Sequence, residues 1–255
     1  MNIIGIIQAR MGSTRLPGKV LKPLAGRPML WHVLKRAQAA RRVDETVLAT
    51  TTRREDRALA VVAKDCGVSC FFGDENDVLD RYFEAAKLWQ ADVIVRITGD
   101  CPLLDPAVVD TVVVAYLAGN FDYVSNTIEP TYPDGLDTEV CSFSALERAW
   151  REAKLPSERE HVTPYIWKHP DLFKISNVKA QMPNANVDLS SHRWTLDTPE
   201  DLEFLRLVIS ACEANGNCSL DAVMGILREH PDWRAINAQY ARNEGYAKSL
   251  REDEE

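Results

Sequence analysis

Residues 2–19 of the chain read NIIGIIQARMGSTRLPGK, an apolar run followed directly by a loop rich in small residues and positive charge. A continuous apolar run that ends in a polar loop is typical of a strand buried on both faces, as in a parallel sheet. In open α/β sheets, ligands bind beyond the carboxyl ends of the strands. Residues 2–9 therefore predict a central strand, and residues 10–19, called the basic loop below, predict a ligand site.

Strand and helix patterns alternate after this loop. Predicted strands are residues 46–51, 68–72, 92–97 and 121–125, and predicted helices are residues 28–41, 54–66, 77–90 and 106–117. This alternation favours an α/β domain with a mostly parallel sheet. Later predicted strands are residues 135–143, 173–178 and 192–195, and later predicted helices are residues 144–153, 158–168, 199–214 and 220–229.

The weaker rhythm after residue 127 indicates an insertion. We interpret residues 1–250 as one domain that carries a small inserted lobe at residues 128–190. Residues 251–255 follow as an acidic tail, which we expect to be solvated.

Composition bounds the class of protein. The 255 residues are 45% hydrophobic and carry a net charge of −8, which excludes a disordered chain and disfavours a broad basic surface for nucleic acid. No apolar stretch approaches the roughly 20 residues needed to span a membrane, and no basic segment precedes the first apolar run. The six cysteines form no C-x-x-C pair, so a zinc site or disulfide framework is not indicated. We expect a cytoplasmic protein with no membrane and no nucleic-acid partner.

The basic loop carries the strongest chemical signal. Its three cations, Arg10, Arg15 and Lys19, are interleaved with Gly12 and Ser13, whose backbone N–H groups can approach an anion. This combination suits a triphosphate, because Arg grips phosphate oxygens in a fork and Lys acts as a point charge. The alternative is a flexible, solvated loop. The spacing does not match the G-x-x-x-x-G-K-[ST] loop of P-loop nucleotide hydrolases.

Two further stretches end predicted strands with an acidic residue. Residues 93–102 read VIVRITGDCP and residues 193–202 read RWTLDTPEDL. Mg²⁺ prefers one or two carboxylates completed by phosphates and water, so Asp100 and Asp197 predict a metal site facing the basic loop. The alternatives are a turn or helix-capping role for each aspartate.

The middle segment offers candidates for binding a second substrate. Asp134, Asp137 and Glu139 lie in an acidic turn, which could equally be a simple hairpin turn. Glu160 and His161 lie near a predicted helix start, where His161 could transfer a proton or the pair could merely be exposed.

Residues 10–29, 98–102 and 196–201 together resemble, in the same order, the motifs of sugar cytidylyltransferases. The family includes SpsF-like spore-coat polysaccharide proteins and the CMP-sugar synthetases for 3-deoxy-manno-octulosonate and acylneuraminate. The resemblance implies a Rossmann-like nucleotide-diphospho-sugar transferase fold with an inserted dimerisation lobe. It also implies transfer of CMP from CTP to a sugar, with release of pyrophosphate and with Mg²⁺ bound by Asp100 and Asp197.

The resemblance also implies roles for individual residues. Candidate nucleotide-binding residues are Ala9, Arg10, Gly12, Ser13, Arg15, Lys19, Asp77, Arg81 and Thr98. Candidate catalytic residues are Lys19, Arg10 and Asp100. The middle lobe departs from the octulosonate enzymes, so the acceptor stays open between acidic and amino sugars for polysaccharide or glycoconjugate synthesis. We expect a homodimer by the same resemblance, in line with apolar residues at 145–150 and 165–167.

Two other functions remain open at this stage. A glycosyltransferase that consumes a nucleotide sugar would also need an acidic metal ligand at a strand end, but no clear D-x-D pair is present. A nucleotide-binding module without catalysis is disfavoured, because nucleotide affinity alone does not require both Asp100 and Asp197.

Overall fold

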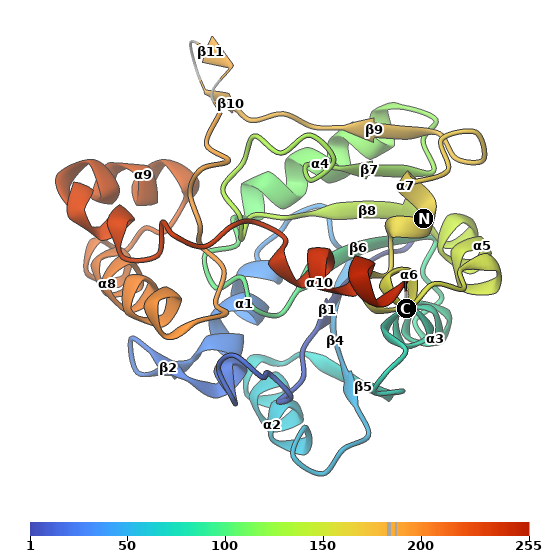
Figure 1. Ribbon diagram of the computed structural model, residues 1–255, viewed down its shortest axis with the longest axis horizontal. Helices are drawn as coiled ribbons and strands as arrows, with labels where there is room; N and C mark the ends of the chain where they lie inside the picture. The colour runs from blue at the N-terminus through green and yellow to red at the C-terminus, as the bar shows by residue number, and fades with distance from the viewer. Residues whose placement is uncertain (183–184, 187, 255) are drawn as a thin grey trace.

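A seven-stranded sheet forms the centre of the computed structural model, which describes residues 1–182, 185–186 and 188–254 (Figure 1). The strand order is β5-β4-β1-β6-β8-β7-β9. Its members are β1 (Ile3–Gln8), β4 (Glu45–Thr51), β5 (Ser69–Gly73), β6 (Val93–Thr98), β7 (Tyr123–Ser125), β8 (Glu139–Ser142) and β9 (Ile175–Asn177). Only β8 runs antiparallel to its neighbours. The predicted α/β class with a mostly parallel sheet is confirmed.

Four short strands lie outside this sheet. They pair two by two as β2 (Pro23–Leu24) with β3 (Arg27–Pro28), and β10 (Gln181–Met182) with β11 (Ala185–Asn186).

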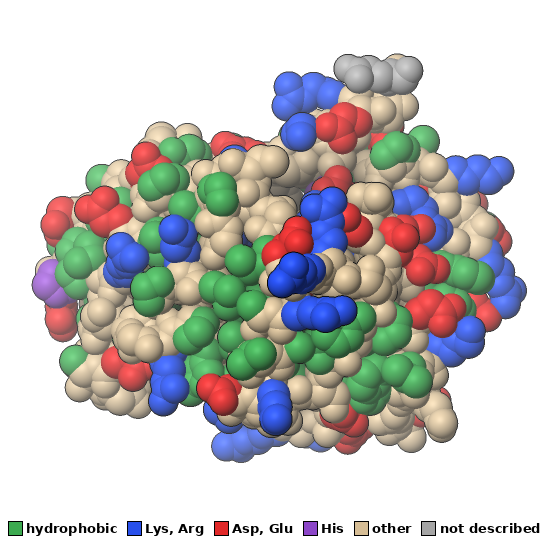
Figure 2. Space-filling view, turned by 90° about the horizontal axis from the view of Figure 1, so that it is seen from below, with side chains coloured by type: hydrophobic (Ala, Val, Ile, Leu, Met, Phe, Trp, Pro, Cys, Tyr) green, Lys and Arg blue, Asp and Glu red, His purple; other side chains and the backbone are tan. Residues whose placement is uncertain are grey.

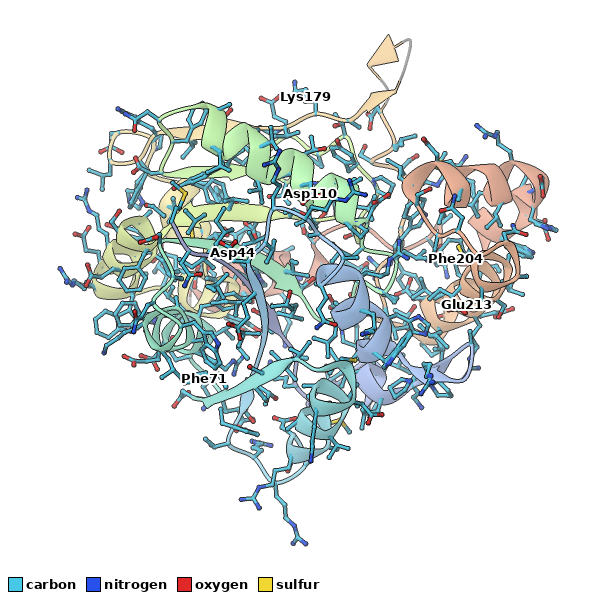
Figure 3. The ribbon with its side chains drawn as sticks, turned by 180° about the vertical axis from the view of Figure 1, so that it is seen from behind. Asp44, Phe71, Asp110, Lys179, Phe204 and Glu213 are labelled. Carbon is cyan, nitrogen blue, oxygen red and sulfur yellow. The ribbon has the colours of Figure 1, made fainter. Side chains whose placement is uncertain are left out.

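Helices cover both faces of the sheet, as alternation along β1 requires. Ile3 and Ile7 join a core with α1 (Met29–Ala37), α2 (Arg57–Cys66) and α4 (Pro106–Ala118), which cross the sheet in the rear view of Figure 3. Ile4 and Ile6 join a second core with α3 (Val78–Leu88) and α5 (Phe143–Glu152). The remaining helices are α6 (Pro156–His161), α7 (Pro164–Trp167), α8 (Pro199–Asn215), α9 (Leu220–Glu229), α10 (Glu244–Glu252) and the 3-10 turns η1 (Lys19–Leu21) and η2 (Pro231–Ala235).

Local sequence sets several helix starts. The Asp105 carboxylate accepts the Ala107 N–H at 2.8 Å, with Pro106 in the first turn of α4. Thr198 and Asp201 cap α8 reciprocally, and Pro199 follows the cap. These caps satisfy backbone donors that a helix leaves unpaired at its N-terminus.

Three predicted elements differ from the structure. Residues 192–195 are not a strand, because Trp194 N–H donates to Asp134 and Leu196 N–H donates to Asp100, two different segments. The predicted helix at 158–168 is split into α6 and α7, since Val162 has a φ of 73° and Pro164 starts the second helix. The predicted strand at 135–143 is paired only over β8.

The C-terminal region also differs from expectation. Helix α10 was not predicted, and it includes residues 251 and 252 of the expected tail. Asp253 accepts both the N–H and the hydroxyl of Ser157, so this part of the tail is bound to the domain rather than solvated. The predicted lobe at 128–190 contributes β8 and β9 to the main sheet, and its role as a separate lobe stays a prediction.

The surface carries positive and negative side chains mixed together. On the face in Figure 2, Lys and Arg side chains stand among Asp and Glu side chains rather than forming one basic field. Within the described part of the chain, every helix is too short or too polar to cross a membrane.

Candidate active site

The basic loop and the segment after β6 leave the sheet side by side. β1 and β6 are parallel neighbours, with Gln8 opposite Thr98 at their carboxyl ends. Gly99 N–H donates to the Gln8 carbonyl at 2.8 Å, and a Cβ at position 99 would lie 2.4 Å from that oxygen. Only glycine allows this approach, which brings Asp100 to the start of the basic loop.

The segment before α8 completes the junction. Leu196 N–H donates to the Asp100 carbonyl at 2.9 Å, so the next residue, Asp197, lies beside Asp100. Lys19 Nζ lies between the two carboxylates, 2.8 Å from Asp100 Oδ2 and 2.7 Å from Asp197 Oδ1. The structure therefore brings together the three residues that were predicted as the catalytic lysine and the metal ligands.

Burial and charge act in opposite directions on these groups. Burial alone would lower the pKa of Lys19 and raise the pKa of Asp100. The ion pairs dominate, so the pKa of Lys19 is raised and the pKa of Asp100 falls to about 2. Lys19 and Asp100 are therefore both charged at neutral pH.

The donor set fits Mg²⁺. No group of three or more His, Cys, Asp or Glu side chains close enough to hold a metal occurs among the described residues. Asp100 and Asp197, however, already converge on one cationic group, and carboxylate oxygens are the hard ligands that Mg²⁺ prefers. Two carboxylates are sufficient where substrate phosphates and water complete the coordination.

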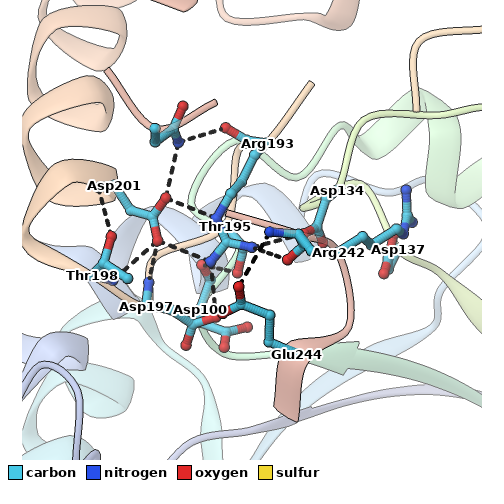
Figure 4. A network of polar contacts seen from close by, with 12 residues as sticks. Asp100, Asp134, Asp137, Arg193, Thr195, Asp197, Thr198, Asp201, Arg242 and Glu244 are labelled. Carbon is cyan, nitrogen blue, oxygen red and sulfur yellow. Dashed lines mark hydrogen bonds and ion pairs between the residues drawn. The ribbon is translucent and has the colours of Figure 1, made fainter. Parts of the chain in front are cut away.

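Arg193 holds Asp197 in place through a buried network (Figure 4). Its Nε and Nη2 donate to the two Asp201 oxygens at 2.9 and 3.0 Å, and its Nη groups reach Asp134 and Asp197 at 3.2 and 3.3 Å. Asp201 also accepts the Asp197 N–H at 2.9 Å. Asp201 is fully buried, so these bonds offset the cost of removing its charge from water.

A hollow of about 820 Å³ opens beside the basic loop. Eight of the nine predicted nucleotide-binding residues line it, namely Ala9, Arg10, Gly12, Ser13, Arg15, Lys19, Arg81 and Thr98. A Cβ at Gly12 would meet no atom within 4 Å, so the backbone there is open to a ligand. Gln8 Oε1 and Arg81 Nε line the same hollow, and neither has a hydrogen-bond partner in the described part of the chain.

Asp77 is not among the residues that line this hollow. Its carboxylate caps α3 by accepting the Asp80 N–H at 2.9 Å, and it also accepts the Arg159 Nε at 3.0 Å. Its side chain is committed to these two structural contacts.

The basic loop is anchored rather than loose. Leu16 of the loop and Val20 directly after it are buried, and the Met11 N–H donates to Asp56 Oδ1 at 2.6 Å. Arg15 reaches Asp197 at 3.1 Å and Glu244 at 2.6 Å, whereas Arg10 lies 3.8 Å from Glu160. These contacts disfavour the alternative of a flexible, solvated connector.

A second hollow of about 420 Å³ shares Asp100, Asp197 and Thr98 with the first. We call the two the larger and the smaller hollow. Four of the five predicted acceptor-binding residues line the smaller hollow, namely Asp134, Asp137, Glu139 and His161, and the fifth, Glu160, lines the larger one.

Burial perturbs the acids of the smaller hollow. It raises the pKa of Asp134 to about 6, although Arg242 and Arg193 partly oppose it, and raises the pKa of Asp137 to about 7 against the opposing charge of Arg242. Glu139 is held by Arg96 and by the hydroxyl of Thr163 at 2.6 Å.

His161 is the one histidine in this wall. Burial lowers the pKa of its imidazole, and Nε2 lies 3.0 Å from the hydroxyl of Ser249. The ring is therefore neutral at pH 7.

Several site residues were missed at the sequence level. Of these, Arg96 was the easiest to predict from the sequence, since a charge inside the apolar strand VIVRIT requires a buried partner. Arg193 and Arg242 meet acids far away in the sequence, and no local pattern shows this.

The α/β fold brings Asp100 and Asp197 together beside the basic loop, and comparison with known proteins identifies the family. Residues 4–219 match the sequence model described as "Cytidylyltransferase". The chain belongs to the cytidylyltransferase family.

Individual relatives agree with this assignment. The chain is 33% identical to the spore coat polysaccharide biosynthesis protein SpsF of Bacillus subtilis, over 91% of this chain and 96% of the relative. It is 42% identical to a 3-deoxy-manno-octulosonate cytidylyltransferase of Geobacter sulfurreducens, over 85% and 94%. The solved structure of a cytidylyltransferase from Leptospira borgpetersenii superposes with a TM-score of 0.85 at 33% identity, over 94% of this chain and 100% of that one.

Proposed function

We propose that this protein transfers CMP from CTP to a hydroxyl group of a sugar and releases pyrophosphate. The observation that carries the proposal is Lys19 between Asp100 and Asp197, where a hollow with a cationic loop meets a second hollow. A transfer between two substrates needs such a shared wall, because the acceptor oxygen must reach the α-phosphorus in line with the departing pyrophosphate.

The larger hollow would hold CTP. Arg10 and Arg15 would bind the outer phosphates, and the backbone N–H groups of Gly12 and Ser13 would donate to phosphate oxygens. The unpaired Arg81 Nε would gain a partner from the nucleotide, since buried polar atoms are nearly always bonded.

Lys19 would stabilise charge at the transferred phosphate, after exchanging a carboxylate contact for a phosphate oxygen. We propose Asp100 and Asp197 as the residues that hold Mg²⁺. A bound Mg²⁺ would neutralise charge on the α-phosphate and on the pyrophosphate.

The smaller hollow would hold the acceptor, which we propose is an acidic or amino sugar used in polysaccharide or glycoconjugate synthesis. The names of the relatives in B. subtilis and G. sulfurreducens support a sugar of this kind. His161 is neutral at pH 7 and lines this hollow, so it would accept the proton of the attacking hydroxyl.

Pyrophosphate release tests the proposal directly. The protein is incubated with CTP, Mg²⁺ and a panel of acidic and amino sugars, with Asp100→Asn as the matched variant. We expect pyrophosphate only when CTP and a suitable sugar are both present, and a strong loss in the variant. Consumption of a sugar nucleotide without any CTP-dependent pyrophosphate would contradict it and favour a glycosyltransferase.

We also propose a homodimer that uses residues 128–190. The exposed apolar side chains of Ile128 and Leu155 in this segment support it. Trp150 gives no such support, because its ring stacks on the ring of Phe83 within the same chain, with 4.2 Å between the ring centres. Light scattering that shows a monomer at high protein concentration would contradict the proposal.

A further inference from the structure

Helix α10 lies beyond residue 219, where the family match ends, yet it lines both hollows. It runs beside α6 at the front of the molecule in Figure 1. Nothing in the family match gives this helix a function.

Specific contacts fix α10 against the site. At its first residue, Glu244 accepts from Arg15 of the basic loop at 2.6 Å. One to two turns later, the buried Ser249 hydroxyl donates to Glu160 at 2.7 Å and lies 3.0 Å from His161 Nε2. The helix is thus held to the basic loop at one end and to α6 along its length.

Two cations of α10 line the larger hollow. Arg251 donates its Nε to the Ala247 carbonyl at 3.3 Å, and no carboxylate lies within 4.0 Å of its guanidinium in the described residues. Lys248 has an exposed pair with Glu252 at 3.4 Å, a kind of contact that contributes little and yields readily to a stronger anion. Both side chains are therefore available to a ligand.

The cations of the basic loop are less available. Lys19 is shared by two carboxylates, Arg15 by two, and Arg10 lies near one. A nucleoside triphosphate carries several negative charges, so further positive charge beside the basic loop would strengthen its binding.

We propose that Lys248 and Arg251 bind the triphosphate of CTP, so that α10 forms part of the nucleotide site. The inference rests on the proposed function, which places CTP in the larger hollow. It assigns to the C-terminal helix a role in affinity for the phosphates and none in recognition of the base.

Calorimetric titration with CTP and with CMP separates these contributions. We expect Lys248→Ala and Arg251→Ala each to raise the dissociation constant of CTP about 3- to 10-fold, the range for exposed charge-assisted contacts. CMP lacks the outer phosphates, so its affinity should change less than about 2-fold. The difference should shrink at high salt, because salt screens exposed charges.

Two controls match these variants. Lys248→Arg keeps the charge and should retain CTP affinity. Lys64→Ala removes an exposed cation from α2, outside both hollows, and should leave the dissociation constants of CTP and CMP unchanged.

The outcomes are distinguishable. Unchanged CTP affinity in both alanine variants, or equal losses for CTP and CMP, would overturn this inference while the wild-type protein still binds CTP. Failure of the wild-type protein to bind CTP would instead overturn the proposed function and this inference with it.

Discussion

Replacing Lys19 by Met removes the positive charge between Asp100 and Asp197 but keeps most of the side-chain volume. The three side chains are only 13%, 26% and 20% exposed, so solvent compensates the loss poorly. Asp197 would retain Arg15 and Arg193, whereas Lys19 is the one cation within 4.0 Å of Asp100 among the described residues. The cost therefore falls chiefly on Asp100.

The pKa of Asp100 gives the magnitude. Its depression from 3.8 to about 2 corresponds to about 2 kcal/mol of stability at pH 7. Because the pKa of Asp100 is lower in the folded state than in the unfolded state, its ionised form stabilises the fold above the unfolded pKa. This stabilisation is lost as pH falls through the folded pKa. Without Lys19, burial raises the pKa of Asp100 above 3.8, so the wild-type advantage over Lys19→Met should start to decline above pH 3.8 and continue to fall towards about pH 2.

Turnover should fall more than stability. Removal of one group that stabilises transition-state charge typically costs on the order of 10²-fold in rate. Denaturant unfolding measures the first effect, and pyrophosphate release measures the second. Lys19→Arg keeps the charge and serves as the control.

Mg²⁺ provides a further readout in the same variant. Asp100, left without a cation, and the neighbouring Asp197 should bind the ion, and binding to the folded state alone raises the free energy of unfolding. We expect Mg²⁺ to stabilise Lys19→Met but not the double variant Lys19→Met/Asp100→Asn. A Lys19→Met protein with unchanged stability and turnover would refute the whole argument and leave the basic loop as a connector.

Three other changes test separate parts of the structure. Asp137→Asn should flatten the pH dependence of stability. Burial raises the pKa of Asp137 to about 7, so the wild-type protein should lose stability as pH rises from about 4 to 7. An equal slope of stability against pH in both proteins would contradict this. Asp77→Ala should lower stability by about 1 kcal/mol or more through loss of the α3 cap and the Arg159 pair, with KM for CTP unchanged; a raised KM with unchanged stability would restore Asp77 to the nucleotide site. Gly99→Ala should destabilise by about 2 kcal/mol or more, because its Cβ would lie 2.4 Å from the Gln8 carbonyl oxygen; unaltered thermal unfolding would show that the junction can relax.

The proximity of the basic loop and Asp100 could be predicted, because it follows from where two neighbouring strands end. The apolar run of β1 and the acid after β6 mark two strand ends, and parallel neighbours deliver those ends to one edge. Asp197 was placed correctly beside Asp100 although residues 192–195 form no strand. A single backbone hydrogen bond, from the Leu196 N–H to the Asp100 carbonyl, places Asp197 there, and not the pairing of two β-strands.

The parts that were missed depend on contacts distant in sequence. Arg242 meets Asp137, and Glu244 meets Arg15, more than a hundred residues apart. Helix α10 is short, and such helices depend on tertiary packing more than on their own propensity. The sequence of residues 244–252 alone does not predict the contacts of Ser249 that hold α10 in place.

The late position of α10 in the chain has a consequence for synthesis. Residues 1–220 include β1, β6, Asp100 and Asp197, so all of these leave the ribosome before α10 does. The wall made by Glu244, Lys248 and Arg251 is absent at that point, so the larger hollow is open on one side. If Lys248 and Arg251 bind the triphosphate as proposed, the nucleotide site is complete only after residue 252 has left the exit tunnel and α10 has packed beside α6.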